Sequence, residues 1–280
     1  MVGAQAKREA AQTIESEYRI SERRACQLLD FPRSTKRYLS TKDDDSEIRE
    51  RICYWADKRK RFGSPRIHQM LLRDGFIVNH KRTERIYSEE GLSLRSKSKK
   101  RRKYKSEVRV PLKEAIEVND VWAMDFVSDQ FSYGGRFRSL TVVDIFSKLS
   151  PAIEVDRSLT GLRVTHALDR AIEEYGKPRV ICVDNGPEFI CLALDKWASN
   201  HGVELSFSRP GKPTDNAFIE SLNGKFRDEC LNMNWFLSLD MAKEIIEEWR
   251  REYNEERPHS SIEYLTPAEF VAKSKVMKCA

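Results

Sequence analysis

The segment DVWAMDFVSDQ, residues 120–130, is the part of this sequence that most restricts the fold. Its apolar residues alternate between two faces, with Val121, Ala123 and Val127 on one and Trp122, Met124 and Phe126 on the other. A strand that is apolar on both faces needs cover on both sides, as in the centre of an α/β sheet. We therefore expect an α/β domain with this segment near the middle of its sheet.

The residues after 118 alternate between expected strands and helices. Further strands are expected in FRSLTVVDIFSK, which a hairpin at Gly134-Gly135 joins to the first strand, and in SPAIEVD, RVICVD and VELSFSRP. Helices are expected at 160–175, in EFICLALDKWASNHG and at 214–232. Three strands in a meander, followed by alternating helices and strands, predict a mixed five-stranded sheet with flanking helices.

The first 110 residues form a basic half. They contain 29 Lys and Arg against 16 Asp and Glu, a balance of +13, whereas the rest of the chain contains 21 against 28, a balance of −7. A basic segment joined to an acidic one indicates an arm that binds a polyanion. Basic helical faces also occur on proteins that bind no polyanion, so charge alone does not decide the function.

Two helix-turn-helix patterns lie in this basic half. In SERRACQLLDFPRSTKRYLS, Ser21 is the expected N-cap of one helix, Pro32 interrupts the chain, and Ser34 is the expected cap of a second helix. In the other pattern, GSPRIHQMLLRDGF precedes NHKRTERIYSEEGL, whose expected cap is Asn79. The layout is typical of DNA-binding modules, and the alternative is a plain helical hairpin with a basic face. The residues expected to pack inside the second module are Ile48, Ile52, Trp55, Ile67, Met70, Leu71 and Ile86.

Basic residues on these helices form the predicted DNA interface. They are Arg33, Lys36 and Arg37 in the first pattern and His80, Lys81, Arg82 and Arg85 in the second. RSKSKKRRKYK, residues 95–105, adds eight basic residues in eleven, among them Lys99, Lys100, Arg101 and Arg102. We expect this stretch to be a linker that follows a phosphate backbone.

Cysteine spacing and hydropathy exclude several classes of protein. The six cysteines form no C-x-x-C pair and have no His at zinc-finger spacing, so we expect free thiols in a reducing compartment. No apolar run approaches the ~20 residues that span a bilayer. The N-terminus MVGAQAKREAAQ lacks the apolar segment of a signal peptide. A cytoplasmic protein without a membrane partner is therefore expected.

Three acidic residues attract attention for different reasons. Asp125 interrupts the apolar first strand, where an unpaired carboxylate is costly to bury. Asp184 ends the strand RVICVD, at the end of a strand where α/β sheets usually place ligands. Glu220 lies on an expected helix, on a polar arc that includes Asn223 and Arg227. Each residue taken singly also fits an ordinary structural role.

Taken together, the three carboxylates indicate a metal site. Converging anions repel one another unless a divalent cation neutralises them. Mg²⁺ suits such a site because it is hard, prefers oxygen ligands and needs few of them from the protein. Two Mg²⁺ ions about 3.5–4 Å apart, with Mn²⁺ as a substitute, would hold the attacking and leaving oxygens of a phosphoryl transfer. The basic half would then bind the phosphodiester substrate.

These motifs resemble a known family. Asp125 in WAMDFVSD, Asp184 in DNGPEF, and Glu220 after 35 further residues are similar to the D, D-35-E signature of retroviral-integrase-like transposases. NHKRTERIYSEEGL, DNAFIESLNGKFRDECLN and YNEERPHSSIEYLTPAEF resemble the second-frame transposase of family-three bacterial insertion sequences. The resemblance extends over nearly the whole chain.

The resemblance implies an RNase H-like catalytic core at 116–235, with Asp125, Asp184 and Glu220 as catalytic metal ligands. Around this core we expect helix-turn-helix modules at 1–43 and 44–94, a basic linker at 95–115, and a C-terminal helix and loop at 236–280.

The family also assigns DNA contacts to Arg227, seven residues after Glu220, and to Asn185 and Gly186 in the active-site turn. It has a glycine where this chain has Glu263. In such proteins a preceding reading frame often supplies a further helix-turn-helix and a zipper, so an upstream-frame partner protein is expected.

The expected function is Mg²⁺-dependent cleavage of double-stranded DNA at the terminal inverted repeats of an insertion sequence, followed by transfer of the 3′-hydroxyl strand to target DNA. Synapsis of two ends predicts at least a homodimer, and the substrate predicts a location at the bacterial nucleoid. Two alternatives stay open. One is a general RNase H-like nuclease, and the other is a non-catalytic DNA-binding regulator from a decayed element.

Overall fold

The computed structural model describes residues 3–38, 45–94, 115–186, 188–208 and 217–279. The chain divides into two compact units, Met1–Glu47 and Ile48–Ala280. Within the described ranges, no helix combines the length and apolar character needed to cross a membrane. The predicted domain boundaries at 94, 115 and 235 fall inside the second unit and stay predictions.

The N-terminal unit consists of three helices, α1 (Ala4–Tyr18), α2 (Glu22–Leu28) and α3 (Arg33–Arg37). The Ser21 hydroxyl accepts a hydrogen bond from the Arg24 amide, which confirms Ser21 as the N-cap of α2. The prediction of Ser34 as a cap was wrong, because α3 begins at Arg33 and Pro32 occupies the N-cap position with an extended backbone. Ser34 therefore lies within the helix.

A second group of helices comprises α4 (Ser46–Lys58), α5 (Ser64–Arg73) and α6 (His80–Glu89). The Asn79 side chain accepts a hydrogen bond from the Lys81 amide at 2.9 Å and caps α6 as predicted. The predicted inward residues form one cluster: Ile52, Trp55, Ile67, Met70, Leu71 and Ile86 are buried, and Ile48 packs against them.

A five-stranded mixed sheet forms the centre of the second unit. Its strands are β1 (Val121–Gln130), β2 (Arg136–Asp144), β3 (Ile153–Asp156), β4 (Val180–Val183) and β5 (Glu204–Phe207), in the order β3-β2-β1-β4-β5. The pairs β1–β2 and β2–β3 are antiparallel, whereas β1–β4 and β4–β5 are parallel. The sheet confirms the predicted architecture, with β1 in the central position.

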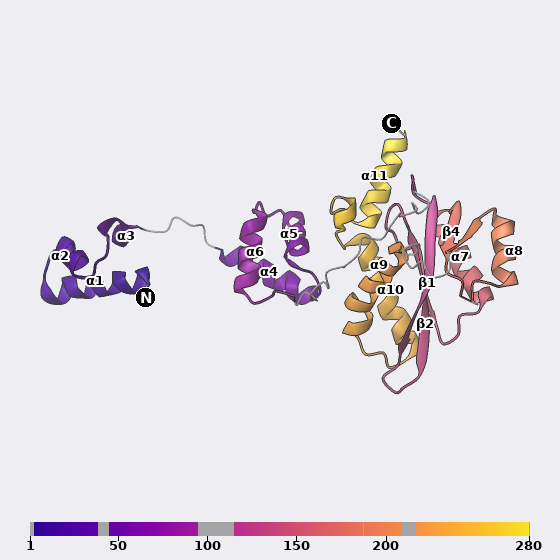
Figure 1. Ribbon diagram of the computed structural model, residues 1–280, viewed down its shortest axis with the longest axis horizontal. Helices are drawn as coiled ribbons and strands as arrows, with labels where there is room; N and C mark the ends of the chain where they lie inside the picture. The colour runs from indigo at the N-terminus through magenta and orange to yellow at the C-terminus, as the bar shows by residue number, and fades with distance from the viewer. Residues whose placement is uncertain (1–2, 39–44, 95–114, 187, 209–216, 280) are drawn as a thin grey trace, which may run out of the picture. The chain divides into compact units, whose positions relative to one another are not determined.

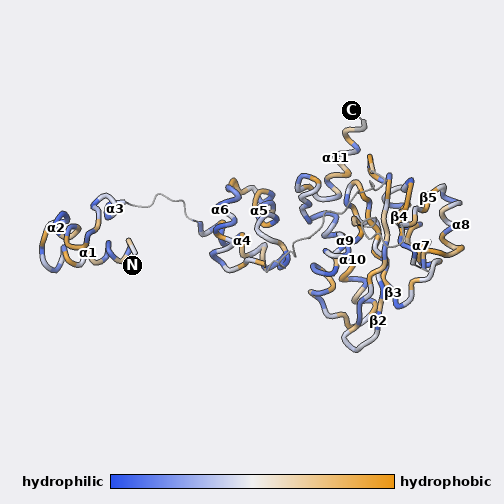
Figure 2. Tube along the Cα trace, in the orientation of Figure 1, coloured by the Kyte–Doolittle hydropathy of each residue, from blue (hydrophilic) through white to orange (hydrophobic). Residues whose placement is uncertain are grey.

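Helices cover both faces of this sheet (Figure 1). Helices α7 (Gly161–Tyr175) and α8 (Leu192–His201) lie on one side, and α9 (Ala217–Glu229) and α10 (Leu239–Glu255) lie on the other. Val121, Ala123 and Val127 pack with residues of α9 and α10, while Trp122, Met124 and Phe126 pack with residues of α7 and α8. Both predicted faces of β1 are therefore confirmed, and hydrophobic residues are frequent along the strands (Figure 2).

The C-terminal part of the chain adds short helices and α11 (Pro267–Cys279). The 3-10 helices η2 (Leu231–Met233) and η3 (Ser260–Ile262) precede α10 and α11 respectively. Glu263 follows η3 with a φ of 60°, in the left-handed region that favours glycine. This backbone conformation agrees with the glycine that the resemblance led us to expect at that position.

The buried imidazole of His259 makes stability depend on pH. His259 is 3% exposed, and burial together with the charges of Arg257 and Lys225 lowers its pKa to about 2. Below pH 6.5 the unfolded chain binds a proton at this residue and the folded protein does not. The free energy of unfolding should therefore fall by about 1.4 kcal/mol per pH unit from this residue alone.

Urea denaturation at pH 7, 6 and 5 measures this dependence. A His259→Asn variant should lose that part of the slope. The matched His166→Asn variant changes an exposed residue of α7 and should keep the full pH dependence of the free energy of unfolding. Equal slopes for wild type and His259→Asn would contradict the prediction.

Candidate active site

Asp125 lies in the middle of β1 on the face that packs against α9. The backbone N–H of Phe126 donates a hydrogen bond to Asp125 Oδ1 at 2.7 Å, and Asn223 Nδ2 donates one to Asp125 Oδ2 at 2.9 Å. Burial raises the pKa of Asp125, and the charges of Asp184 and Glu220 raise it further, while the hydrogen bonds from Phe126 and Asn223 oppose this shift. The three predicted carboxylates are thus close enough to interact electrostatically.

A buried polar network joins the helix α9 to the strands. The Thr141 hydroxyl on β2 lies 2.8 Å from Asn223 Oδ1 and 3.1 Å from the carbonyl oxygen of Asp125. Thr141 is fully buried and Asn223 is 8% exposed. Because Asn223 and Glu220 belong to the same helix, these contacts connect the helix that carries Glu220 to the strand that carries Asp125.

Asp184 immediately follows β4, and a hydrogen-bonded turn holds its side chain. The Gly186 N–H donates to Asp184 Oδ1 at 3.0 Å, and the Asn185 side chain donates to the Ser208 carbonyl at 2.8 Å. A Cβ at Gly186 would lie 2.9 Å from Asp184 Oδ1 and 3.2 Å from Glu188 Oε2. Only glycine therefore allows the two carboxylates to approach the backbone this closely.

Glu220 occupies the first turn of α9 and is exposed. Ile219, Leu222 and Phe226 on the same helix are buried against the sheet. These apolar anchors fix the rotation of α9 and leave the Glu220 carboxylate in solvent, within electrostatic range of Asp125.

The donor set suits a hard divalent cation. Within the described ranges, no group of three or more His, Cys, Asp or Glu side chains is arranged so that it could hold a metal ion. Burial raises the pKa of Asp125, and the repulsion from Asp184 and Glu220 that adds to this shift is, however, the kind that a bound cation relieves. All three side chains provide oxygen ligands. The residues fit Mg²⁺ by their chemistry.

Replacing Asn223 tests the buried network. An Asn223→Leu change keeps the branched shape of the side chain and removes the hydrogen bonds that Asn223 makes with Thr141 and with Asp125 Oδ2. We expect DNA cleavage to fall roughly 10–100-fold, as for other residues that orient metal ligands, and stability to fall by about 1–3 kcal/mol. Cleavage assays and thermal unfolding measure the two effects. Asn200→Leu, at an exposed position of α8, is the matched control. Wild-type cleavage by Asn223→Leu would disprove the role of the network.

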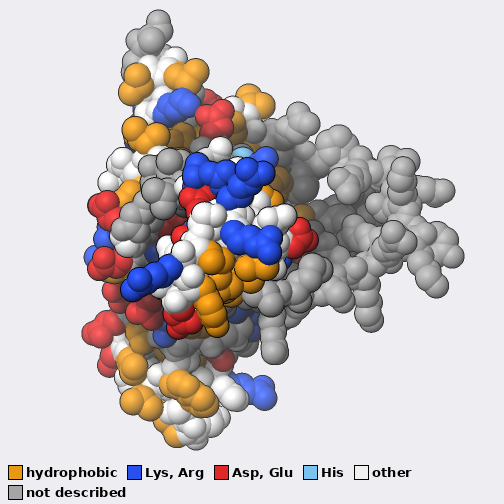
Figure 3. Space-filling model, turned by 90° about the vertical axis from the view of Figure 1, so that its left-hand side faces the viewer, with side chains coloured by type: hydrophobic (Ala, Val, Ile, Leu, Met, Phe, Trp, Pro, Cys, Tyr) orange, Lys and Arg blue, Asp and Glu red, His pale blue; other side chains and the backbone are white. Residues whose placement is uncertain are grey.

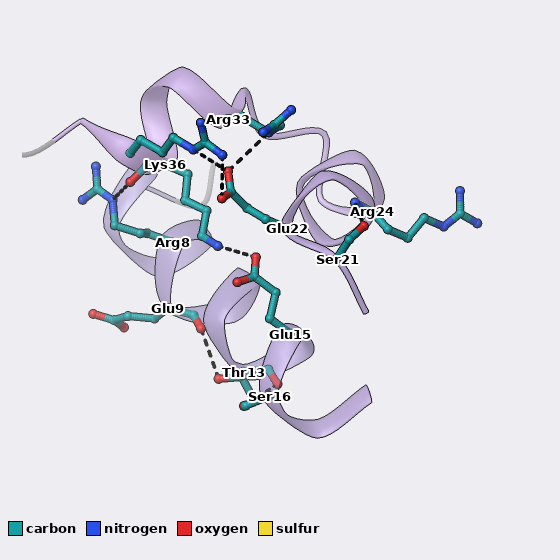
Figure 4. Close-up of polar contacts among 11 residues, drawn as sticks. Arg8, Glu9, Thr13, Glu15, Ser16, Ser21, Glu22, Arg24, Arg33 and Lys36 are labelled. Atoms are coloured by element: carbon teal, nitrogen blue, oxygen red, sulfur yellow. Dashed lines mark hydrogen bonds and ion pairs between the residues drawn. The ribbon is translucent and has the colours of Figure 1, made fainter. Parts of the chain in front are cut away.

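The basic residues of the N-terminal unit that were predicted to contact DNA form ion pairs with acidic residues of the same unit (Figure 4). Arg33 and Arg37 form ion pairs with Glu22, and Lys36 forms one with Glu15. The Lys36 side chain is only 10% exposed, whereas those of Arg33 and Arg37 are 47% and 60% exposed. The two arginines can exchange their partner for a phosphate more easily than Lys36 can.

The other predicted DNA contacts lie in several places. His80, Lys81 and Arg85 are exposed on α6, where Arg82 is half-buried and Arg85 donates to Glu89. Arg227 is exposed on α9, two turns after Glu220. Lys99, Lys100, Arg101 and Arg102 lie outside the described residues. On the face shown in Figure 3, Lys and Arg side chains form separate groups with acidic side chains beside them.

Four residues of the site were assigned no role from the sequence. The sequence placed Asn223 on the same polar side of the expected helix as Glu220. Its position three residues after Glu220 could have indicated that it belongs to the site. Thr141, Arg138 and Glu188 gave no such signal, because their contacts depend on the register of β2 against β1 and on the path of the turn after β4.

Comparison with known proteins identifies the parts of the chain. Models described as "Integrase core domain" match residues 116–213 and 201–267, and one described as "HTH-like domain" matches residues 42–102. A 31.7 kDa protein of insertion element IS407 from Burkholderia multivorans is 46% identical, and the match covers 94% of each chain. A protein of insertion sequence IS150 from Escherichia coli, which carries the name transposase, is 27% identical over 86% of this chain and 90% of its own.

A solved structure shares the fold. The simian T-cell lymphotropic virus intasome in complex with PP2A regulatory subunit B56 gamma contains a chain that superposes with a TM-score of 0.51 at 15% identity, covering 79% of this chain and 73% of its own. The central sheet and its helices are thus the RNase H-like fold of retroviral integrase cores.

Proposed function

This chain belongs to the DDE-superfamily transposases of bacterial insertion sequences, and we propose that it cleaves DNA at the ends of its element and transfers the 3′-hydroxyl strand to target DNA. Asp125, Asp184 and Glu220 are the proposed catalytic residues. The integrase core and the HTH-like domain imply that DNA is the partner.

The observation that carries the proposal is the electrostatic coupling of three carboxylates from separate elements. The charges of Asp184 and Glu220 act on Asp125, although 59 and 95 positions separate them from it in the sequence (184 − 125 and 220 − 125). A protein gains no stability from bringing like charges together around a half-buried aspartate. Such groupings are typical of sites that bind a cation or perform acid–base chemistry.

Asp125, Asp184 and Glu220 would hold Mg²⁺, with Mn²⁺ as a substitute. Bound there, the metal supplies charge neutralisation for the attacking and leaving oxygens of phosphoryl transfer. The protein's own residues prepare this site: Asn223 orients the Asp125 carboxylate, and the Gly186 N–H holds Asp184 Oδ1. Arg227, exposed on the same helix as Glu220, would bind a DNA phosphate next to the reacting strand.

The helices α5 and α6 would recognise the terminal inverted repeats. Asn79 caps α6, and exposed His80, Lys81 and Arg85 follow it. Since both ends of the element are joined in one reaction, the active assembly would contain at least two copies of this chain. An upstream-frame protein would be a further component.

A labelled duplex that contains the terminal repeat tests the proposal. Purified protein with Mg²⁺, alone and with the upstream-frame protein, should nick the duplex at the repeat and join the 3′ end to a target duplex. Nicking without joining and without preference for the repeat would support a general nuclease. Repeat-specific binding without any nick would support a regulator.

A further inference from the structure

We propose that Arg138 and Glu188 act as a positioning pair that fixes the turn carrying Asp184, an inference that rests on the function proposed above. Neither residue is a proposed metal ligand. Arg138 lies on the face of the sheet opposite to Asp125, and Glu188 belongs to the turn that follows β4.

Arg138 connects β2 to this turn. The Arg138 guanidinium forms an ion pair with the Glu188 carboxylate and lies 4.5 Å from the centroid of the Phe126 ring. The Phe126 ring stacks on the fully buried Phe189, with 4.8 Å between centroids. Two consecutive residues of the turn, Glu188 and Phe189, are thus held by side chains of the two central strands.

The path from this anchor to Asp184 runs through Gly186. The carbonyl oxygen of Gly186 accepts hydrogen bonds from the Phe189 and Ile190 amides at 3.0 and 3.2 Å, while its N–H donates to Asp184 Oδ1. The Glu188 and Asp184 carboxylates both lie against Gly186. A shift of Glu188 therefore displaces the backbone that orients Asp184.

The charge of Arg138 has a second consequence. A Glu188 carboxylate without its partner would stand as a further anion beside Asp184, where it would repel that carboxylate or compete with it for a cation. The Arg138 guanidinium neutralises the charge of Glu188 through their ion pair. The Arg138 and Glu188 side chains are 31% and 25% exposed, and partly exposed ion pairs contribute little to stability. The pair should thus affect the site far more than the fold.

Four proteins and one control test the pair: Arg138→Gln, Glu188→Gln, the double variant, and the exchanged variant Arg138→Glu with Glu188→Arg. The control is Arg170→Gln, which removes the Arg170–Glu154 ion pair between α7 and β3, away from the turn. The assays are repeat cleavage against Mg²⁺ concentration, Mn²⁺ binding by calorimetry, DNA binding by gel shift, and thermal unfolding.

At limiting Mg²⁺, Arg138→Gln should cleave roughly 10–100-fold more slowly than wild type, the usual loss for residues that orient metal ligands. Excess Mg²⁺ should recover part of the rate, and Mn²⁺ should bind more weakly. The double variant should be no worse than Arg138→Gln, and the exchanged variant should regain part of the loss. DNA binding and unfolding temperature should match the control.

Wild-type Mg²⁺ dependence in Arg138→Gln, or an equal loss in Arg170→Gln, would overturn the proposal. So would a loss of cleavage that follows only from unfolding. If wild type itself does not cleave, the proposed function fails, and Mn²⁺ calorimetry still decides the role of the pair. Weaker binding by Arg138→Gln then supports it, and equal binding, or none by either protein, overturns it.

Discussion

Asp184→Asn should abolish DNA cleavage and leave DNA binding unchanged. Asparagine has the same shape and can accept the Gly186 hydrogen bond, so the turn should keep its geometry. The lost charge removes a proposed metal ligand, and metal stabilisation of a phosphoryl transition state is worth several kcal/mol. The cleavage rate should fall on the order of 10³-fold or more. Single-turnover cleavage of a labelled terminal repeat measures the rate, and a gel shift measures binding.

The matched control is Asp195→Asn, which removes a carboxylate from an exposed position in the first turn of α8. It should cleave at nearly the wild-type rate. Undiminished cleavage by Asp184→Asn would exclude the proposed triad, and no cleavage by wild type would leave the regulator as the remaining explanation of DNA binding.

Among the substitutions proposed for this protein, Glu229→Ala should lower the free energy of unfolding most. Arg257 donates two hydrogen bonds to the Glu229 carboxylate, at 2.7 and 2.6 Å, and their side chains are only 4% and 11% exposed. Removing one partner of a buried ion pair leaves the other charge uncompensated and costs about 3–5 kcal/mol. For a folded unit of this size the unfolding temperature should fall by roughly 6–20 °C.

Thermal unfolding followed by tryptophan fluorescence measures this change, because Trp122 and Trp249 are buried in the two faces of the core. Glu248→Ala, at an exposed position of α10, should change the unfolding temperature little. A similar effect of both variants would show that the Glu229–Arg257 pair does not stabilise the fold. Since Glu229 ends the helix that carries Glu220, reduced cleavage below the unfolding temperature is also expected.

The sequence was sufficient for the order and type of the strands and flanking helices of the central sheet, but it predicted no helix at Ala4–Tyr18. The alternation in β1 predicted two covered faces, and the caps Ser21 and Asn79 were identified from residue type and position. The wrong cap at Ser34 shows the limit of that rule, because a proline in front of a helix can occupy the N-cap position itself. Capping residues and apolar periodicity predict secondary structure reliably where the conformation of a short segment depends on that segment alone.

The sequence provided less information about whether the predicted DNA-contacting side chains are free to bind a phosphate. Arg33, Lys36 and Arg37 are basic residues on a short helix, and nothing in their spacing shows that Glu22 and Glu15 pair with them. A carboxylate that approaches through tertiary packing changes what a basic side chain is free to bind. The pairs with Glu22 and Glu15 could be recognised only once the three helices were assembled.

The sequence alone determined the family and the mixed sheet, and it supplied the prediction of the three carboxylates, because periodicity and motif spacing can be read along the chain. Only the tertiary structure decided which polar groups meet: Asn223 with Asp125 across 98 positions, Arg138 with Glu188 across 50, and Arg257 with Glu229 across 28. Such contacts follow from strand register and from the rotation of packed helices. These in turn are set by the fit of the whole core rather than by any single segment.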